Sequence, residues 1–232
     1  MRVRVLSGGA AQGLVNALAG QFKAQTGCDI DGAFMPVGGV WGNLVTGRFA
    51  DLLIVTRELV EGACREWVVP GTAVDIGTVQ TGVAVRSGDP ALPLNNSADL
   101  HGALLAADEI YLPDPGYATA GIHFLKVLDR LALRAKLTTA QRLRTFETGG
   151  AAAMRGLAAA TGQRLIGCTQ VTEILVTPGV MLVGSLPKGF ELATVYTAAV
   201  CTRAALPEQA HALAALLAGE EAREARQRVG FV

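Results

Sequence analysis

The chain has 232 residues, half of them hydrophobic and 17% charged, which is enough for one large or two small globular domains. Its 20 basic and 20 acidic residues give a net charge of zero, which favours neither nucleic acid nor an acidic membrane surface as a partner. No apolar run reaches the ~18 residues of a membrane span, so no membrane insertion is expected.

The four cysteines show no CxxC spacing, and no histidine pair stands at ligand spacing. We therefore expect no metal site, no cofactor and no disulfide framework, with the thiols buried. The first residues, Met1 to Leu6, alternate like a strand and do not resemble a signal peptide. As given, the chain is expected to be cytoplasmic. If a signal peptide had been removed, it would be periplasmic.

The first third of the chain predicts alternating strands and helices. Strands are expected at 3–6, 28–34 and 51–55, and helices at 10–25, 40–46 and 57–67. In the first helix Leu14, Leu18 and Phe22 share one face, and Gly27 marks its end. This βαβαβα series predicts a mainly parallel sheet.

A long β-rich stretch at 78–86 leads into a second α/β series, and another at 191–202 leads out of it. The second series has expected strands at 109–112, 143–146, 164–168 and 180–186, and helices at 119–133, 151–160 and 171–175. The closing helices are expected at 207–217 and 220–226.

Two α/β series with two long connections predict an α/β fold of two Rossmann-like lobes joined by two β crossovers. Lobe 1 is expected to comprise residues 1–81 and 196–232, and lobe 2 residues 82–195. A ligand is expected in the cleft between the lobes, where it would meet the carboxyl ends of strands from both sheets. Tyr196, in the return stretch, is interpreted as hinge packing.

Small residues fill several of the strand-to-helix turns. In the first of them, Ser7-Gly8-Gly9-Ala10, backbone N–H groups can approach a ligand closely, and the helix N-terminus favours an anion. The alternative is a tight turn that binds nothing. Comparable turns contain Gly38 and Gly39, Thr119 and Ala120, Gly149 and Gly150, and Gln170 and Thr172. Their spread over both halves predicts one convergent anion site. None of them is a nucleotide-binding loop.

Four segments carry a resemblance that runs nearly end to end. They are Val5–Val15, Leu44–Leu52 with its Gly-x-x-Ala-Asp-Leu motif, Pro113-Asp114-Pro115 followed by Thr119–Ile122, and Arg228–Phe231. Through them the chain resembles the molybdate-binding proteins of ABC importers, which have the type 2 periplasmic binding protein fold. The resemblance implies a small anionic ligand and, for an exported protein, an ABC permease as partner.

The chain departs from that family at the ligand-binding side chains. The family holds a tetrahedral oxyanion through serine hydroxyls of the first two turns, backbone amides and a tyrosine of the second lobe. These side chains align here with Ala10, with Val37 or Gly38, and with Gln170. Because the backbone donors remain while the hydroxyls are lost, we expect an organic di- or tricarboxylate as ligand before molybdate or tungstate.

A branch of the same family resembles aconitate isomerase, which implies an alternative function. The protein would then be a cytoplasmic, cofactor-independent isomerase of an unsaturated di- or tricarboxylate. Such an enzyme needs a group that removes and returns a proton, and Glu173, His123 and Tyr117 are candidates for it. Arg57, just after the third strand, is a candidate for holding a carboxylate in a bidentate way.

Each of these residues also has a purely structural interpretation. Glu173 begins a helix, where the dipole alone favours a carboxylate. His123 lies among apolar neighbours, so a packed or surface position explains it better than catalysis does. Arg57 starts a helix, and solvent exposure explains it as well as ligand binding does. A third hypothesis, a ligand-sensing module, ranks last because no output segment is visible.

Overall fold

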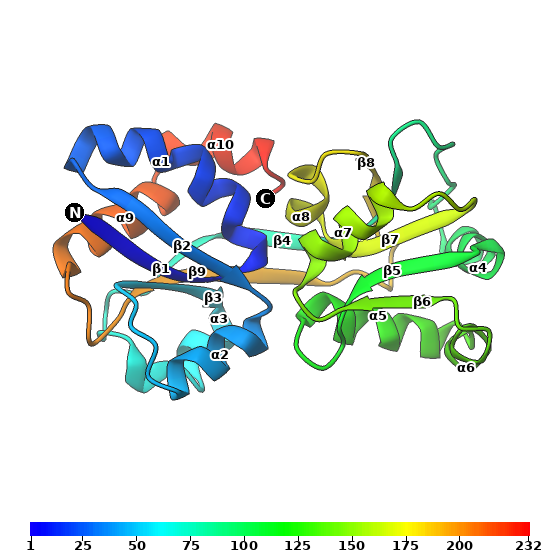
Figure 1. Cartoon of the computed structure of the whole chain (residues 1–232), viewed down its shortest axis with the longest axis horizontal. Coiled ribbons are helices and arrows are strands. Elements are labelled where there is room, and N and C mark those ends of the chain that lie inside the picture. Colours follow the sequence, from blue (N-terminus) through cyan, green and yellow to red (C-terminus); the bar gives the residue numbers. More distant parts are fainter. The chain divides into compact units, whose positions relative to one another are not determined.

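The computed structural model describes all 232 residues and divides them into two compact α/β units (Figure 1). Unit 1 comprises Met1–Val79 and Thr194–Val232, and unit 2 comprises Gln80–Ala193. Two strands join them: β4 (Val74–Arg86) contains one boundary, and β9 (Ala193–Val200) begins at the other. The fold class expected from the sequence is therefore confirmed.

Unit 1 contains a mixed sheet in the order β2-β1-β3-β9. Strand β1 (Arg2–Gly8) pairs in parallel with β2 (Asp29–Met35) and with β3 (Leu52–Thr56), while β9 is antiparallel to β3. The helical elements of unit 1 are η1 (Gly9–Ala11), α1 (Gln12–Thr26), α2 (Val37–Val45), α3 (Arg57–Glu61), η2 (Arg65–Trp67), α9 (Pro207–Ala218), η3 (Glu220–Ala222) and α10 (Arg223–Arg228).

Two separate cores cover the two faces of this sheet. Leu14, Leu18 and Phe22 of α1 pack on one face together with α9, as their spacing predicts. Val40 and Leu44 of α2 pack on the other face. Helix α1 ends at Gly27, which takes the left-handed conformation, with φ 71°, that a glycine adopts at little cost.

Unit 2 has its own sheet, in the order β4-β7-β5-β6, with β8 (Val180–Ser185) also paired to β4. Strand β5 (Glu109–Pro113) pairs in parallel with β6 (Leu143–Phe146) and β7 (Leu165–Gln170), whereas β4 is antiparallel to β7. Its helices are α4 (Ser97–Ala106), α5 (Thr119–Arg130), α6 (Arg134–Thr139), α7 (Gly150–Ala159) and α8 (Val171–Leu175).

The two faces of the unit 2 sheet are also covered separately. Val83 and Cys168 contribute to a core with Phe124 of α5, while Ala84, the next residue of β4, contributes to a core with Met154 of α7. Successive strand residues thus point to α5 and to α7 in turn, as the pleat of a sheet requires.

Three expected helices differ from those in the structure. Helix α2 begins at Val37, three residues early, because Gly39 and Val40 donate to the Pro36 carbonyl and close a helical turn there. The expected helix 57–67 is broken after Glu61, where Gly62 leaves helical geometry. The expected helix 119–133 already ends at Arg130 as α5, and neither α4 nor α6 was expected.

None of the helices combines the length and the apolar character that a bilayer span requires. All four cysteines are buried free thiols.

Candidate anion-binding site

The carboxyl ends of three parallel strands meet at one edge of the unit 1 sheet. Gly8 at the end of β1 stands opposite Met35 at the end of β2, and Ser7 stands opposite Ile54 of β3. Helical elements follow each strand directly, so their N-termini gather at this edge (Figure 1). This is the side of an α/β sheet at which ligands usually bind.

The first turn keeps its backbone donors but not a free hydroxyl. Ser7 is completely buried, and its hydroxyl donates to the Gly8 carbonyl at 2.9 Å. Gly9, Ala10 and Ala11 form a single 3₁₀ turn, and no side chain caps it or α1. The leading N–H groups of this segment therefore offer donors and a positive partial charge without a side-chain hydroxyl.

Tyr196 lies against this first turn. It stands opposite Thr56 in the β3–β9 pair, and a Cβ on Gly8 would lie 2.8 Å from its Cε1 atom and 3.3 Å from its hydroxyl oxygen. The ring also meets Phe231 edge-on, at 6.4 Å between centroids. Gly8 is thus required for close approach of the phenol, a contact that the sequence analysis missed because no local pattern links the two residues.

The second turn contributes less than expected. Because α2 starts at Val37, Gly38 and Gly39 lie inside its first turn and not before it. The Gly39 N–H already donates to Pro36 at 2.8 Å. Only Gly38 of this pair keeps an N–H group that belongs to the unsatisfied start of the helix.

Arg57 is committed to a partner within unit 1. Its guanidinium forms a two-point ion pair with Asp75, which also accepts from the Thr197 hydroxyl at 2.6 Å. The hydrogen bond from Arg57 holds the pKa of Asp75 below its usual value. The three residues border a shallow depression of about 270 Å³. In this structure Arg57 holds the carboxylate of Asp75, and its role as a clamp for a ligand carboxylate stays a prediction.

Unit 2 has a corresponding edge at the carboxyl ends of β5, β6 and β7. These strands run parallel and are followed by α5, α7 and α8, so three helix N-termini gather there. Helix α5 packs tightly onto the end of β5, since a Cβ on Gly121 would overlap the Pro113 carbonyl. No side chain caps α5, which leaves the amides of Thr119 and Ala120 at an open helix start.

Glu173 fills the N-terminus of α7. Its buried carboxylate accepts a hydrogen bond from the Thr169 hydroxyl at 2.5 Å and further ones from backbone N–H groups, those of Gln170, Gly150 and Ala151. Burial raises the pKa of Glu173, against the opposing effect of these donors. A Cβ on Gly150 would overlap both the hydroxyl and the carboxylate.

This contact shows how two expected site residues are placed. The Gly150 N–H donates to Glu173, and Gly149 precedes α7 with a φ of 105°. The Glu173 carboxyl group is held by several donors, and it occupies the start of α7 as well as lying in its own helix, α8.

Two buried hydroxyls near this edge have no hydrogen-bond partner, those of Thr81 and Thr172. Thr172 lies in the first turn of α8, and Thr81 stands opposite Gln170 in the β4–β7 pair. Thr172 was expected among the binding residues. Thr81 was not, since a threonine inside a β-rich stretch carries no signal of its own.

The other two candidates for proton transfer, His123 and Tyr117, form no hydrogen bond with Glu173. His123 Nε2 lies 2.7 Å from the Phe190 carbonyl oxygen, to which it donates, so the half-buried ring ties α5 to the segment before β9. Tyr117 is 54% exposed, in the loop before α5.

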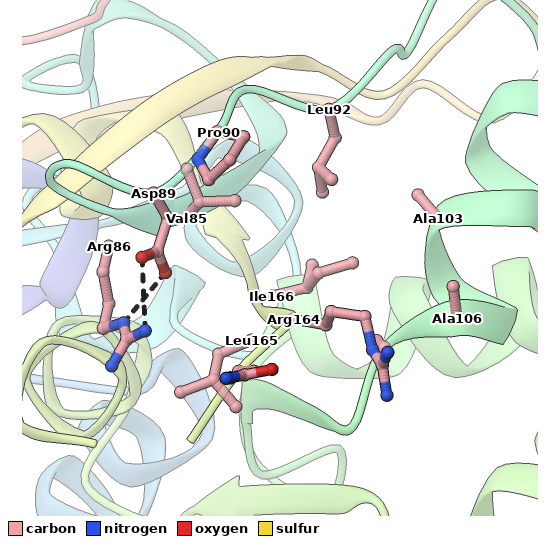
Figure 2. A pocket seen from close by; sticks show the side chains of 12 residues that line it. Val85, Arg86, Asp89, Pro90, Leu92, Ala103, Ala106, Arg164, Leu165 and Ile166 are labelled. Atoms are coloured by element: carbon pink, nitrogen blue, oxygen red, sulfur yellow. Dashed lines mark hydrogen bonds and ion pairs between the residues drawn. The ribbon is translucent and has the colours of Figure 1, made fainter. Parts of the chain in front are cut away.

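An apolar pocket of about 400 Å³ opens at the opposite edge of the unit 2 sheet (Figure 2). Val85, Leu165 and Ile166 line it, at the end where β7 begins. Arg86 at its border is paired in two-point fashion with Asp89. The pocket therefore offers no unpaired positive charge from Arg86 and differs from the helix-rich edge. No group of three or more His, Cys, Asp or Glu side chains is arranged to hold a metal ion.

Residues 3–232 match the family model of bacterial extracellular solute-binding proteins. The chain belongs to this family. Binding of a small solute is the function that the family and the fold support.

Individual relatives extend this picture. The chain is 27% identical over 234 residues to an aconitate isomerase from a Pseudomonas species, covering 98% of this chain and 86% of that protein. Its fold is similar to that of the periplasmic molybdate-binding protein of Azotobacter vinelandii, with a TM-score of 0.83 at 20% identity and coverage of 99% and 98%. A sulfate-binding protein from Mycobacterium tuberculosis gives a TM-score of 0.73 at 16% identity, with coverage of 100% and 86%.

Proposed function

We propose that the protein binds a small organic anion with two or three carboxylates. One observation carries the proposal: each unit has, at the carboxyl edge of its parallel strands, a helix start that no side chain caps. Such a start attracts negative charge through its free N–H groups and its dipole. A carboxylate oxygen of a ligand can accept hydrogen bonds from a start of this kind in either unit.

The side chains at these edges support an organic anion over a compact oxyanion. Ala10 has no hydroxyl, and the Ser7 hydroxyl is engaged by the Gly8 carbonyl, so the first turn offers a ligand backbone donors only. Small residues at this turn leave room for carbon atoms next to the anionic group.

A thermal-shift panel tests the proposal. The purified protein is heated with trans-aconitate, cis-aconitate, citrate, molybdate or sulfate, and the melting temperature is followed against ligand concentration. We expect one of the polycarboxylates to raise it by several degrees in a saturable manner. A strong shift with molybdate and none with the polycarboxylates would overturn the choice of ligand.

The alternative function is isomerisation of an unsaturated polycarboxylate, favoured by the similarity to an aconitate isomerase along nearly the whole chain. In that reaction a proton leaves one carbon and returns to another as the double bond moves. Glu173 and His123 both have partners in the structure, which is why binding ranks first. Proton NMR of cis-aconitate mixed with the protein decides the matter: formation of the trans isomer at catalytic protein concentrations would establish the enzyme.

The partner depends on which function holds. A binder that is exported would deliver its ligand to an ABC permease, whereas an isomerase needs none. Genetic linkage to permease genes, compared with linkage to catabolic genes, separates the two cases.

A further inference from the structure

The hydroxyls of Thr81 and Thr172 stand out among the polar groups of unit 2. Both residues are 1% exposed, and neither hydroxyl has a hydrogen-bond partner. Burying a hydroxyl without a partner costs free energy, so native proteins rarely keep one without a reason. Other buried threonines nearby are satisfied: Thr169 donates to the Glu173 carboxylate and Thr177 to the Glu173 carbonyl.

The register places Thr81 on the side of the sheet that carries α5. Thr81 and Val83 point to the same face of β4, and Val83 packs with Phe124 of α5. The Thr81 backbone is fixed on both sides, since its N–H donates to Leu192 and its carbonyl accepts from Leu186. Only the hydroxyl is left without a partner.

The open start of α5 belongs to the same edge. Thr81 stands opposite Gln170 on β7, and the β5–β7 register continues to Asp114, beyond the end of β5. Neighbouring strands lie about 4.8 Å apart, so the row from Thr81 to Asp114 spans about 10 Å, the size of a small ligand. Asp114 turns its carboxylate to the Gly116 N–H at 2.7 Å.

We propose that Thr81 and Thr172 are ligand-binding residues whose hydroxyls donate to carboxylate oxygens of the ligand at the carboxyl edge of the unit 2 sheet. The inference rests on the proposed function and names the side chains of unit 2 that would contact the ligand. The Glu173 carboxyl group already occupies the start of α7, which leaves the start of α5 and these two hydroxyls as donors for the ligand. All of these donors are neutral, and they suit a carboxylate that also bonds to backbone amides.

Replacement of each threonine by valine tests the proposal, because valine keeps the shape and removes only the hydroxyl. The affinity for trans-aconitate, measured by calorimetry, is expected to fall at least about tenfold in Thr81→Val and in Thr172→Val, since each loses a hydrogen bond to a charged group. The ligand-free variants are expected to melt no lower than the wild type, because an unpaired buried hydroxyl is removed.

Thr177→Val is the matched control. Its hydroxyl is buried but paired with the Glu173 carbonyl, so this variant should melt lower and bind trans-aconitate as the wild type does. This reversed pattern separates a ligand-binding threonine from a structural one.

Two results would overturn the inference. Wild-type affinity in both Thr81→Val and Thr172→Val would show that the hydroxyls do not touch the ligand, while leaving the proposed function intact. Melting temperatures below the wild type in both ligand-free variants would show that the hydroxyls are structural, whether or not any ligand binds. A wild type that binds none of the tested anions would contradict the proposed function itself.

Discussion

Each unit contains a buried carboxyl group, Asp51 in unit 1 and Glu173 in unit 2, next to its sheet. The two groups lie at opposite ends of the parallel strands. In unit 1 Asp51 precedes β3, so its carboxylate lies at the amino end of the strand, away from the candidate edge. In unit 2 Glu173 lies inside the candidate edge and fills the start of α7. The edge of unit 1 thus remains without an internal anion, whereas unit 2 keeps α5 open and closes α7.

The two carboxylates also differ in their pKa shifts. Burial opposes ionisation of both. For Asp51, N–H groups of Arg4, Leu206 and Ala205 outweigh burial and hold the pKa below its usual value. For Glu173, burial prevails and the pKa is raised. Asp51 is part of the Gly-x-x-Ala-Asp-Leu motif, so that motif marks a structural clamp on the segment before α9 and not a ligand contact.

The same substitution made at both edges gives the largest expected effect. Gly150→Ala should destabilise the protein by about 3 kcal/mol or more, because the new Cβ overlaps Thr169 and the fixed Glu173 carboxylate. Gly8→Ala should cost less, since its Cβ would lie 2.8 Å from Tyr196 Cε1, a milder overlap than those of about 2 Å at Gly150. Chemical denaturation measures both. Gly20→Ala, in an open position of α1, is the control and should be neutral or slightly stabilising.

Asp51→Asn should have the next largest effect. Asparagine keeps one acceptor oxygen but loses the charge that three backbone N–H groups hold, so unfolding should become easier by about 2 kcal/mol. The pKa of Asp51 is lowered on folding, so its stabilisation is present above about pH 4 and is lost as the pH falls further. The difference between variant and wild type should therefore shrink in acid. A difference that stays constant would contradict the assigned role.

Glu173→Gln should change the pH dependence of stability in the sense opposite to Asp51→Asn. Folding raises the pKa of Glu173, so its contribution to stability is complete below about pH 4.3 and is lost as the pH rises through the folded-state value. The wild type minus variant difference in melting temperature should decrease from about pH 4.5 to pH 8. An increase over that range would mean that the carboxylate is favoured by its donors more than it is penalised by burial.

Arg57→Gln should have the smallest effect. The guanidinium is exposed and paired with Asp75, so trans-aconitate affinity should not change. A large loss of affinity would show that Arg57 binds a carboxylate of the ligand. Unit 1 would then contribute a charged side chain as well as backbone donors.

Local patterns predicted most of the fold. The apolar spacing in α1, the stop at Gly27 and the strand runs follow from chemistry within a few residues, and the structure confirms them. Helix α4 was missed, although Asn96, whose side chain accepts from the Ala98 and Asp99 N–H groups, is a recognisable cap.

The candidate site could be predicted only in part. Small residues and helix starts mark both edges, but the partners that decide their use are distant in sequence. Arg57 meets Asp75, and Gly8 meets Tyr196, across separations that no local pattern reports. Thr81 is an ordinary strand residue until the register sets it opposite Gln170. Pairing across a sheet is fixed by the packed fold, so these contacts emerge only from the structure.

Backbone hydrogen exchange, measured with and without trans-aconitate, tests the central claim most directly. If a polycarboxylate binds to an open helix start, amides of residues 9–12 in unit 1 or of residues 119–121 in unit 2 should gain protection, while those of 150 and 151, already bound to Glu173, should change little. Protection at neither open start, or protection at residues 150 and 151 instead, would contradict it.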